Sequence, residues 1–188
     1  MSIKIQADPT MEQVLGWADG TDLQKEAMYL ESQGQFTAAE HKYLEAIRAK
    51  EAGFGPDHYT TGTSYDCLGE LYLKMERIDK AEEYLKKALR AREHSGFSSD
   101  LAMTREHLGK LFEMKGDLQA AQEIRLKGLP DNIACGNVNC LRLQNSLKDL
   151  SKCSACKAVL YCSQACQKAD WKRHRKYCRR IEGDVTEA

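Results

Sequence analysis

Seven of the eight cysteines lie between residues 135 and 178, and their spacing limits the possible folds more than any other feature of the chain. With one histidine they form four closely spaced pairs of candidate metal ligands: Cys135-x4-Cys140, Cys153-x2-Cys156, Cys162-x3-Cys166 and His174-x3-Cys178. A structural zinc ion takes four sulfur or nitrogen ligands in a tetrahedron, so eight ligands fill two sites and leave no position for a catalytic water. The segment therefore predicts two structural Zn²⁺ ions.

The spacing within each pair predicts the local structure that presents it. Two intervening residues suit a tight turn, whereas three place both ligands one helical turn apart on one face. We therefore expect Cys162 and Cys166 to open one short helix. His174 and Cys178 should lie on a second helix, from about Lys168 to Arg180. Four pairs can be shared between two zinc ions in three ways, and the spacing alone does not choose among them.

The rest of the chain indicates a reducing compartment, which favours metal ligands over disulfides. The first ten residues, MSIKIQADPT, lack the arrangement of a secretory signal, and no stretch approaches the roughly 20 apolar residues of a membrane span. We expect an intracellular protein of the cytoplasm, the nucleus or both, with no membrane contact. The eighth cysteine, Cys67, is interpreted as a small buried hydrophobic residue without a function.

The first two thirds of the chain contain an internal repeat. Three related segments begin at Gly34, Glu76 and Gly116. Their aligned alanines, at positions 39, 81 and 121, are offset by 42 and 40 residues. A second small residue precedes each alanine by 12 positions, at Ala27, Gly69 and Gly109. Because two helices approach closely only where the facing side chains are small, the pattern predicts three helix pairs.

Helix boundaries are suggested by local signals. Three pairs have the spacing of a capping box, in which two side chains satisfy the free amides of a helix start: Thr21 with Gln24, Thr37 with Glu40, and Asp79 with Glu82. Gly34 and Gly116 suit the left-handed residue that ends a helix. The predicted domains are an N-terminal segment, 1–21, with a capping helix from Pro9 to Ala18; helical repeats, 22–129; a linker, 130–134; the zinc module, 135–178; and a tail, 179–188.

The middle unit resembles a tetratricopeptide repeat (TPR) in the spacing of Tyr65, Leu68, Gly69, Tyr72, Ala81, Leu85 and Ala88. Its length is similar to the long-helix repeats of kinesin light chains. The resemblance implies an α-α superhelix whose groove, lined by the first helix of each pair, binds a peptide or helix of a partner; the alternative is a rigid spacer. The carboxylate clamp of chaperone-binding members is not expected, because its positions hold Gln24, Met28, Asp66, Glu70, Glu106 and Lys110.

The string YCSQACQKADWKRHRKYC, from Tyr161 to Cys178, resembles the MYND zinc finger. That resemblance implies a cross-brace in which the first zinc is held by Cys135, Cys140, Cys162 and Cys166, and the second by Cys153, Cys156, His174 and Cys178. The first pair departs from the usual two-residue spacing, although Gly136 and Asn137 make a wider turn plausible. Because the ligands are interleaved, metal binding and folding should be one event, and we expect chelation to unfold 135–178 and to spare the repeats.

The same resemblance implies a surface that binds short proline-rich peptides. Gln167 and Trp171 occupy the positions that help to form this surface in peptide-binding MYND domains. Val159, Leu160 and Tyr161 are β-favouring residues and would form the strand against which the peptide lies. The alternative for Trp171 is a purely structural role, packed against the second zinc site.

Basic residues crowd the end of the module, namely Lys168, Lys172, Arg173, Arg175, Lys176, Arg179 and Arg180. A nucleic-acid interface is the alternative that they suggest. However, seven thiolates and two zinc ions together contribute −3, which lowers the formal excess of +5 over residues 131–188 to about +2. Much of the basic charge is therefore expected to offset zinc–thiolate charge, and nucleic acid is not the expected partner.

The combined interpretation is a mainly α protein, with a TPR-like superhelix followed by a small cross-braced zinc module, that acts as a protein–protein adaptor and not as an enzyme. MYND modules also occur in SET-domain lysine methyltransferases, but only about ten residues follow Cys178, too few for a SET domain. A role as an accessory or regulatory subunit of a chromatin or methyltransferase-type complex is the remaining alternative. The order of cysteines and histidine does not follow the RING pattern of ubiquitin ligases.

Overall fold

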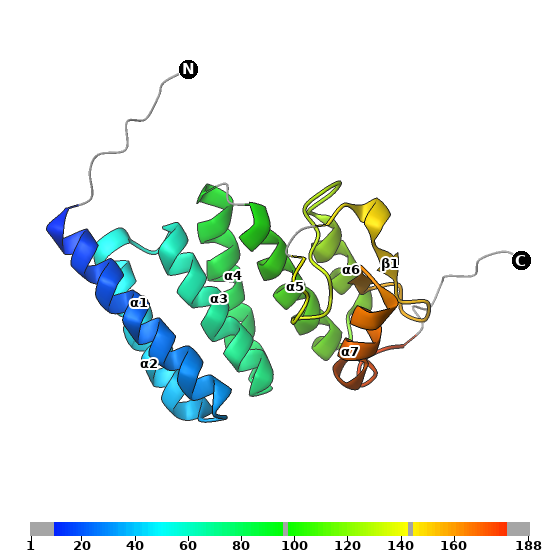
Figure 1. Cartoon of the computed structure of the whole chain (residues 1–188), viewed down its shortest axis with the longest axis horizontal. Helices are drawn as coiled ribbons and strands as arrows, with labels where there is room; N and C mark the ends of the chain where they lie inside the picture. The colour runs from blue at the N-terminus through cyan, green and yellow to red at the C-terminus, as the bar shows by residue number, and fades with distance from the viewer. Residues whose placement is uncertain (1–9, 96–97, 143–144, 180–188) are drawn as a thin grey trace, which may run out of the picture.

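The computed structural model describes residues 10–95, 98–142 and 145–179 and is mainly helical (Figure 1). Six helices form three consecutive hairpins: α1 (Met11–Ser32), α2 (Phe36–Phe54), α3 (Tyr59–Lys74), α4 (Ile78–Ser95), α5 (Ser98–Lys115) and α6 (Leu118–Leu126). The hairpins stack side by side along the molecule, and the zinc module lies at the α5–α6 end. The predicted fold class and the three helix pairs are confirmed.

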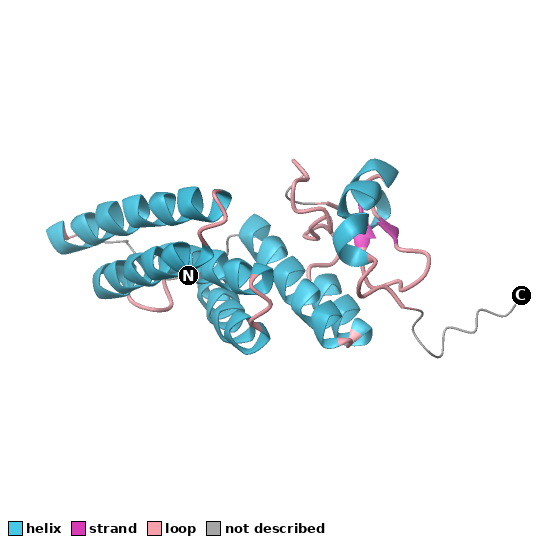
Figure 2. Ribbon diagram, turned by 90° about the horizontal axis from the view of Figure 1, so that it is seen from below, coloured by secondary structure: helices cyan, strands magenta, loops and turns pink. Residues whose placement is uncertain are grey.

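The zinc module contains little regular structure (Figure 2). A short 3₁₀ helix, η1 (Leu147–Asp149), precedes strand β1 (Ser151–Lys152), which pairs antiparallel with β2 (Leu160–Tyr161). One helix follows, α7 (Gln164–His174). Among the described residues, no helix is both long and apolar enough to span a bilayer.

The close contacts between paired helices occur at the predicted small residues. Ala81 is completely buried, and a Cβ added to Gly69 would lie 2.6 Å from Leu85 Cδ2. Tyr72, which is 1% exposed, fills the adjacent space and donates a hydrogen bond to Glu40 Oε1 at 2.7 Å. The alignment of small residues therefore places α3 against α4 and carries the core from one repeat into the next.

The first hairpin differs from the prediction at its start. Helix α1 continues through Thr21, so there is no separate capping helix within the described residues, and Pro9 lies outside them. Gly20 lets α1 pack closely on α2 at this point, because an added Cβ would lie 2.7 Å from Lys50 Cγ. Gln24, expected in a capping box, instead accepts hydrogen bonds from Lys50 Nζ at 2.7 Å and Ser64 Oγ at 2.6 Å. The predicted helix start at Thr21 is therefore wrong.

The second predicted capping box is also wrong, because α2 begins at Phe36 and Gln35 precedes it without a side-chain cap. Its expected partner, Glu40, pairs with Arg77 Nη1 at 2.7 Å in the next hairpin. Asp79 lies in the first turn of α4, as expected for a residue near a helix start. The sequence analysis did not predict that Asp117 caps the start of α6. Its carboxylate accepts a hydrogen bond from the amide of Ala120 at 2.9 Å.

All three first helices end in the same turn. Gly34 and Gly116 have φ values of 75° and 81°, as predicted for left-handed residues that end a helix. The equivalent residue of the middle hairpin is Glu76, with φ 57°. Its neighbour Arg77 donates its backbone N–H to Tyr72 O at 2.9 Å, which is the hydrogen bond that closes such a turn.

Replacing Glu76 by glycine should stabilise the protein. The left-handed conformation costs a residue with a Cβ about 1–2 kcal/mol, whereas glycine adopts it freely. After allowing for the greater freedom of glycine in the unfolded chain, we expect a gain of about 0.5–1 kcal/mol in urea unfolding of the zinc-loaded protein. The matched control is Glu83→Gly, at an exposed site inside α4, which should lose about 1 kcal/mol. Equal losses in both variants would contradict the explanation.

Residues 130–134, predicted as a linker, are packed into the structure. Ile133 and Ala134 are 1% and 3% exposed, and Ile133 forms an antiparallel bridge with Asn145. Leu118 and Ala121 of α6 belong to the same apolar cluster as the buried cysteines of the zinc module. The last hairpin and the zinc module therefore share one core and are not two bodies on a tether.

Candidate metal centres

The first candidate metal centre contains Cys135, Cys140, Cys162 and Cys166, whose sulfur atoms lie within 4.8 Å of one another. Cys162 Sγ lies 3.5 Å from both Cys140 Sγ and Cys166 Sγ. Tetrahedral zinc with Zn–S bonds of about 2.3 Å places its sulfurs about 3.8 Å apart. The four thiolates therefore fit a closed structural zinc site.

The second centre contains Cys153, Cys156, His174 and Cys178, with ligand atoms again within 4.8 Å of one another. Cys153 Sγ lies 3.7 Å from Cys178 Sγ, and Cys156 Sγ lies 3.4 Å from His174 Nε2. The two sets are the interleaved sets that the MYND resemblance implies. Two structural zinc ions are thus the cofactors of this chain, and all eight ligands are used in closed sites.

A single helix presents the last two ligand pairs, contrary to the prediction of two helices. Cys162 precedes α7, Ser163 caps it by accepting from Cys166 N at 3.2 Å, and Cys166 lies in the first turn. His174 ends the helix, and Cys178 lies in the turn beyond it, where its amide donates to His174 O at 3.0 Å. The turn, not a continued helix, brings the sulfur back toward His174.

The five-residue separation of Cys135 and Cys140 is explained by Asn137. The Asn137 side chain accepts from Asn139 N at 3.2 Å, and its backbone carbonyl accepts from Cys140 N at 2.9 Å. Its Nδ2 also donates to Cys166 Sγ at 3.5 Å and lowers the pKa of that thiol to about 7. One residue thus closes the wide turn and favours the thiolate that a metal requires.

Cys153 is prepared as a ligand by its backbone surroundings. Burial alone would raise the pKa of this thiol, but the amides of Cys156 and Ala155 and the His174 ring outweigh burial and lower it to about 7. The tight turn is completed by Lys157, which has φ 55° and donates its amide to Cys153 O at 2.9 Å. The predicted tight turn at this pair agrees with these contacts.

The repeats orient the histidine ligand. His174 is fully buried, and its Nδ1 donates to Glu113 Oε2 of α5 at 2.8 Å, across 61 residues of sequence. Burial disfavours a charged imidazole, but the contacts with Cys156 and Glu113 outweigh burial and raise the pKa of metal-free His174 to about 10. Such a carboxylate fixes the ring so that Nε2 faces the metal.

Arg125 of α6 holds this carboxylate in place. Its guanidinium is 1% exposed, pairs with Glu106 and Glu113, and donates to Ala158 O of the zinc module at 3.0 Å. Gly109 makes room for it, because an added Cβ would lie 2.5 Å from Arg125 Cζ. The sequence analysis missed Glu113 and Arg125, although an arginine at a position facing a small helix residue was an available signal.

The basic end of α7 is partly neutralised inside the protein. Arg173 donates from Nε and Nη2 to Asp170 at 2.7 Å each and from Nη1 to Glu113 at 3.1 Å. Asp170 also accepts from the Tyr161 hydroxyl at 2.8 Å. Arg173 therefore pairs with carboxylates, not with zinc-binding sulfur atoms, and stabilises the join between the modules.

The predicted peptide-binding residues separate into two groups. Trp171 is 45% exposed, while its ring also packs edge-on against His174 at 6.1 Å between centroids; Gln167, one turn earlier, is half-buried. Val159 and Tyr161 are 0% and 2% exposed, so their side chains do not lie on a surface. β2 forms as expected over Leu160–Tyr161, but Leu160 O already accepts from Gly136 N at 2.8 Å. Of the four predicted peptide-binding residues, only Gln167 and Trp171 therefore have side chains that reach the surface.

The fold and the sites define a helical-repeat protein that ends in a cross-braced two-zinc module. Comparison with known families gives the same result. The tetratricopeptide repeat model matches residues 22–94 and 66–129, and the MYND finger model matches 134–178. The chain belongs to the tetratricopeptide-repeat proteins and carries a C-terminal MYND finger. Both are protein-interaction modules.

The related proteins share single modules with this chain. "SET domain-containing protein 14" of Caenorhabditis elegans is 49% identical over 43 residues, which are 23% of this chain and 10% of that protein. "MYND-type zinc finger protein samB" of Emericella nidulans is 39% identical over 44 residues, 23% of this chain and 8% of that protein. The chain thus spans only about a tenth of these relatives.

A solved structure supports the repeat domain. BtubC (BKLC) from P. vanneervenii superposes with a TM-score of 0.57 at 27% identity. The superposition covers 62% of this chain and 48% of that one. The likeness is consistent with the long-helix repeats that the sequence predicts.

Proposed function

We propose that the protein is a non-catalytic adaptor in which the MYND surface at Gln167 and Trp171 holds a short proline-rich segment while the repeat groove holds a second partner. The observation that carries the proposal is the position of Trp171. It is 45% exposed on a helix fixed at both ends by zinc ligands. A large aromatic side chain held rigidly at the surface is a typical anchor for a partner.

Proline-rich segments suit this surface for physical reasons. An extended polyproline segment has already lost much of its conformational freedom, so binding orders it at little further entropic cost. Trp171 offers an apolar face to a proline ring, and the Gln167 amide offers both a donor and an acceptor to the peptide backbone. Val159 and Tyr161 would support this surface from beneath. The contact area is small, so the affinity should be modest.

The second partner would occupy the face formed by the first helices. A cavity of about 440 Å³ lies between α1, α2 and α3, and another of about 230 Å³ lies between α3, α5 and the zinc module. Both are lined by Glu70 and Lys74, so they are neighbours along one groove. This supports a binding role for the repeats over that of a rigid spacer. A cytoplasmic or nuclear location is part of the same proposal.

An accessory role in a methyltransferase-type complex is the second candidate. It is favoured by the match to a SET-domain protein, whose aligned part covers 23% of this chain. The matched residues carry zinc ligands and no acid, base or nucleophile placed for catalysis, which favours a regulatory part over an enzymatic one. Binding of S-adenosylmethionine by the isolated protein, measured by calorimetry, would contradict the non-catalytic proposal.

The adaptor proposal predicts which peptides the protein selects. A peptide-display selection on the zinc-loaded chain should enrich proline-rich sequences. The double variant Gln167→Ala/Trp171→Ala should weaken their binding at least tenfold, because it removes the apolar anchor and the amide. The matched control is Gln164→Ala/Lys172→Ala, at exposed positions on the same helix, which should change the affinity less than twofold.

Each variant must first be shown to retain two zinc ions per chain, since loss of metal would remove the surface altogether. Proline-rich peptides that bind equally well to both double variants would show that the MYND surface is not their site. A selection in which no peptide of any kind is enriched would contradict the peptide-adaptor function as a whole.

A further inference from the structure

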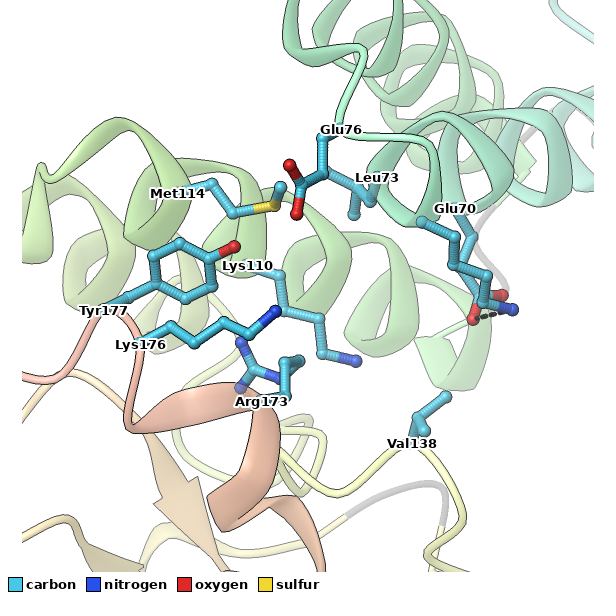
Figure 3. Close-up of a pocket in the computed structure, with 10 residues that line it drawn as sticks. Glu70, Leu73, Glu76, Lys110, Met114, Val138, Arg173, Lys176 and Tyr177 are labelled. Carbon is cyan, nitrogen blue, oxygen red and sulfur yellow. Dashed lines mark ion pairs between the residues drawn. The ribbon is translucent and has the colours of Figure 1, made fainter.

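The cavity of about 230 Å³ lies where the repeats meet the zinc module, and its wall combines both (Figure 3). Its apolar side is formed by Leu73, Met114, Val138 and Tyr177, from α3, α5 and the two ends of the zinc module. Val138 is 46% exposed, so part of this apolar wall is open to solvent. At about 30 Å³ for each water molecule, the cavity has room for roughly one side chain and a few waters.

The other side of the cavity is cationic. Four basic side chains line it, against two carboxylates: Lys74, Lys110, Arg173 and Lys176 against Glu70 and Glu76. Glu70 is already paired with Lys74 at 3.0 Å. Figure 3 shows Lys110, which comes from α5, and Arg173 and Lys176, which come from the end of the zinc module, lining the same pocket. Cations gathered in this way attract an anion.

Lys110 is the residue that points to a ligand. It is 7% exposed, and among the described residues none forms a hydrogen bond or an ion pair within 4.0 Å with its ammonium. Its carboxylate neighbours Glu106 and Glu70 act on it only at longer range, and burial lowers its pKa. The side chain is buried along most of its length, but its ammonium is not among the fully buried polar atoms that lack a partner, so it reaches open space with three donors free for an acceptor. The open side of its surroundings is the cavity.

Lys176 adds a second ammonium at the rim. Lys176 is exposed, and none of the described residues forms a hydrogen bond or ion pair with its ammonium group. Arg173, in contrast, already forms ion pairs with Asp170 and Glu113. It therefore adds positive charge to the cavity but few free hydrogen-bond donors. A ligand carboxylate placed between Lys110 and Lys176 would therefore receive hydrogen bonds from both ammonium groups while its apolar neighbour packs on Tyr177 and Met114.

We infer that this junction cavity binds a carboxylate side chain of a partner protein, presented next to an apolar residue in an acidic-hydrophobic segment. This deepens the groove half of the proposed function and rests on it. The site differs from the carboxylate clamp whose residues this chain lacks, because its two unpaired ammonium groups, Lys110 and Lys176, come from α5 and from the zinc module. Only the zinc-loaded, joined protein contains both halves of it.

The probe is a peptide recovered by display selection on the full-length, zinc-loaded chain, together with a twin in which each aspartate and glutamate is replaced by its amide. We expect acidic-hydrophobic peptides to be enriched and to bind at least tenfold more tightly than their twins in fluorescence anisotropy. The difference should shrink as the salt concentration rises, because screening weakens attraction between exposed charges.

Lys110→Met removes the ammonium and keeps most of the length of the side chain. It should lower affinity for the acidic peptide at least tenfold and leave the twin unaffected, without lowering the melting temperature, because no partner is left unpaired. Lys176→Met, at an exposed site that carries no risk to folding, should lower affinity at least threefold. The matched control Lys86→Met removes an equal charge from α4, away from the cavity, and should change affinity less than twofold.

The inference is overturned if acidic peptides are not enriched, if peptide and twin bind equally, or if both lysine variants bind the acidic peptide as the wild type does. It is also overturned if Gln167→Ala/Trp171→Ala abolishes acidic-peptide binding, because the MYND surface would then be the site. Enrichment of proline-rich peptides alone would contradict this inference and would still support the MYND half of the proposed function.

Discussion

Removal of zinc should unfold residues 135–178 and also loosen α6 and the end of α5, while α1 to α4 remain folded. Structural zinc sites in small modules contribute about 10–16 kcal/mol at neutral pH, far more than a module of this size can replace. Leu118 and Ala121 of α6 share a core with the buried cysteines, so their packing is lost with the module. Arg125 loses its contact with Ala158 at the same time.

Hydrogen exchange measured by mass spectrometry can resolve this pattern. After chelation, peptides from 118–126 should exchange much faster than before, whereas peptides from 59–74 should keep their protection. The control is the same chelator already saturated with zinc, which should change neither. This expectation differs from the sequence-based one, in which the repeats are spared as a whole. Unchanged protection in α6 after complete loss of metal would show that the shared core does not couple the modules.

Replacing Glu113 by alanine should cost about 3–5 kcal/mol of stability and reduce zinc affinity at the second site by about 10–100-fold. Glu113 is fully buried and accepts from His174, Arg125 and Arg173. Its pKa is held far below the usual range because, although burial raises it, the charge of Arg125 and the contact with His174 outweigh that cost. Without it, a buried guanidinium loses a partner and the imidazole ligand is no longer oriented.

The measurement combines thermal unfolding with competitive chelation by a chromogenic zinc indicator. One of the two zinc ions should be released more easily in Glu113→Ala, and the other should keep its wild-type affinity. Glu123→Ala, at an exposed position of α6, should change neither quantity appreciably. Glu113→Gln, which keeps an acceptor for His174 but not the charge, should fall between the two. Equal weakening of both zinc sites would argue for general unfolding and against orientation of His174.

The repeats and the ligands could be predicted because each has a short-range pattern. Ala39, Ala81 and Ala121 are completely buried, as their alignment suggests, since a helix contact demands a small residue at a fixed place. The eight zinc ligands come together because two tetrahedra exclude most other arrangements. Contacts of this kind can be predicted from sequence wherever the geometry permits only one type of residue.

The join between the modules could not be predicted in the same way. Glu113 and His174 are 61 residues apart, and a glutamate on a helix is usually exposed to solvent. The capping box expected at Thr21 does not form, although its local sequence signal is good. Packing of α1 on α2, where Gly20 meets Lys50, outweighs that signal. Val159 and Tyr161 were assigned to a surface from their strand preference, which carries no information on which side faces water.

The shared core also sets the size of the piece that could be moved between proteins. A fragment that begins at Pro130 would contain all eight ligands. However, it would expose to solvent the apolar surface that Leu118 and Ala121 cover, and it would lack the Glu113 carboxylate that orients His174. The smallest transplantable unit therefore begins at Ser98, where α5 starts, and includes a helix hairpin that a domain boundary drawn from cysteines alone would discard. In engineering terms, the metal finger and the last repeat are one part.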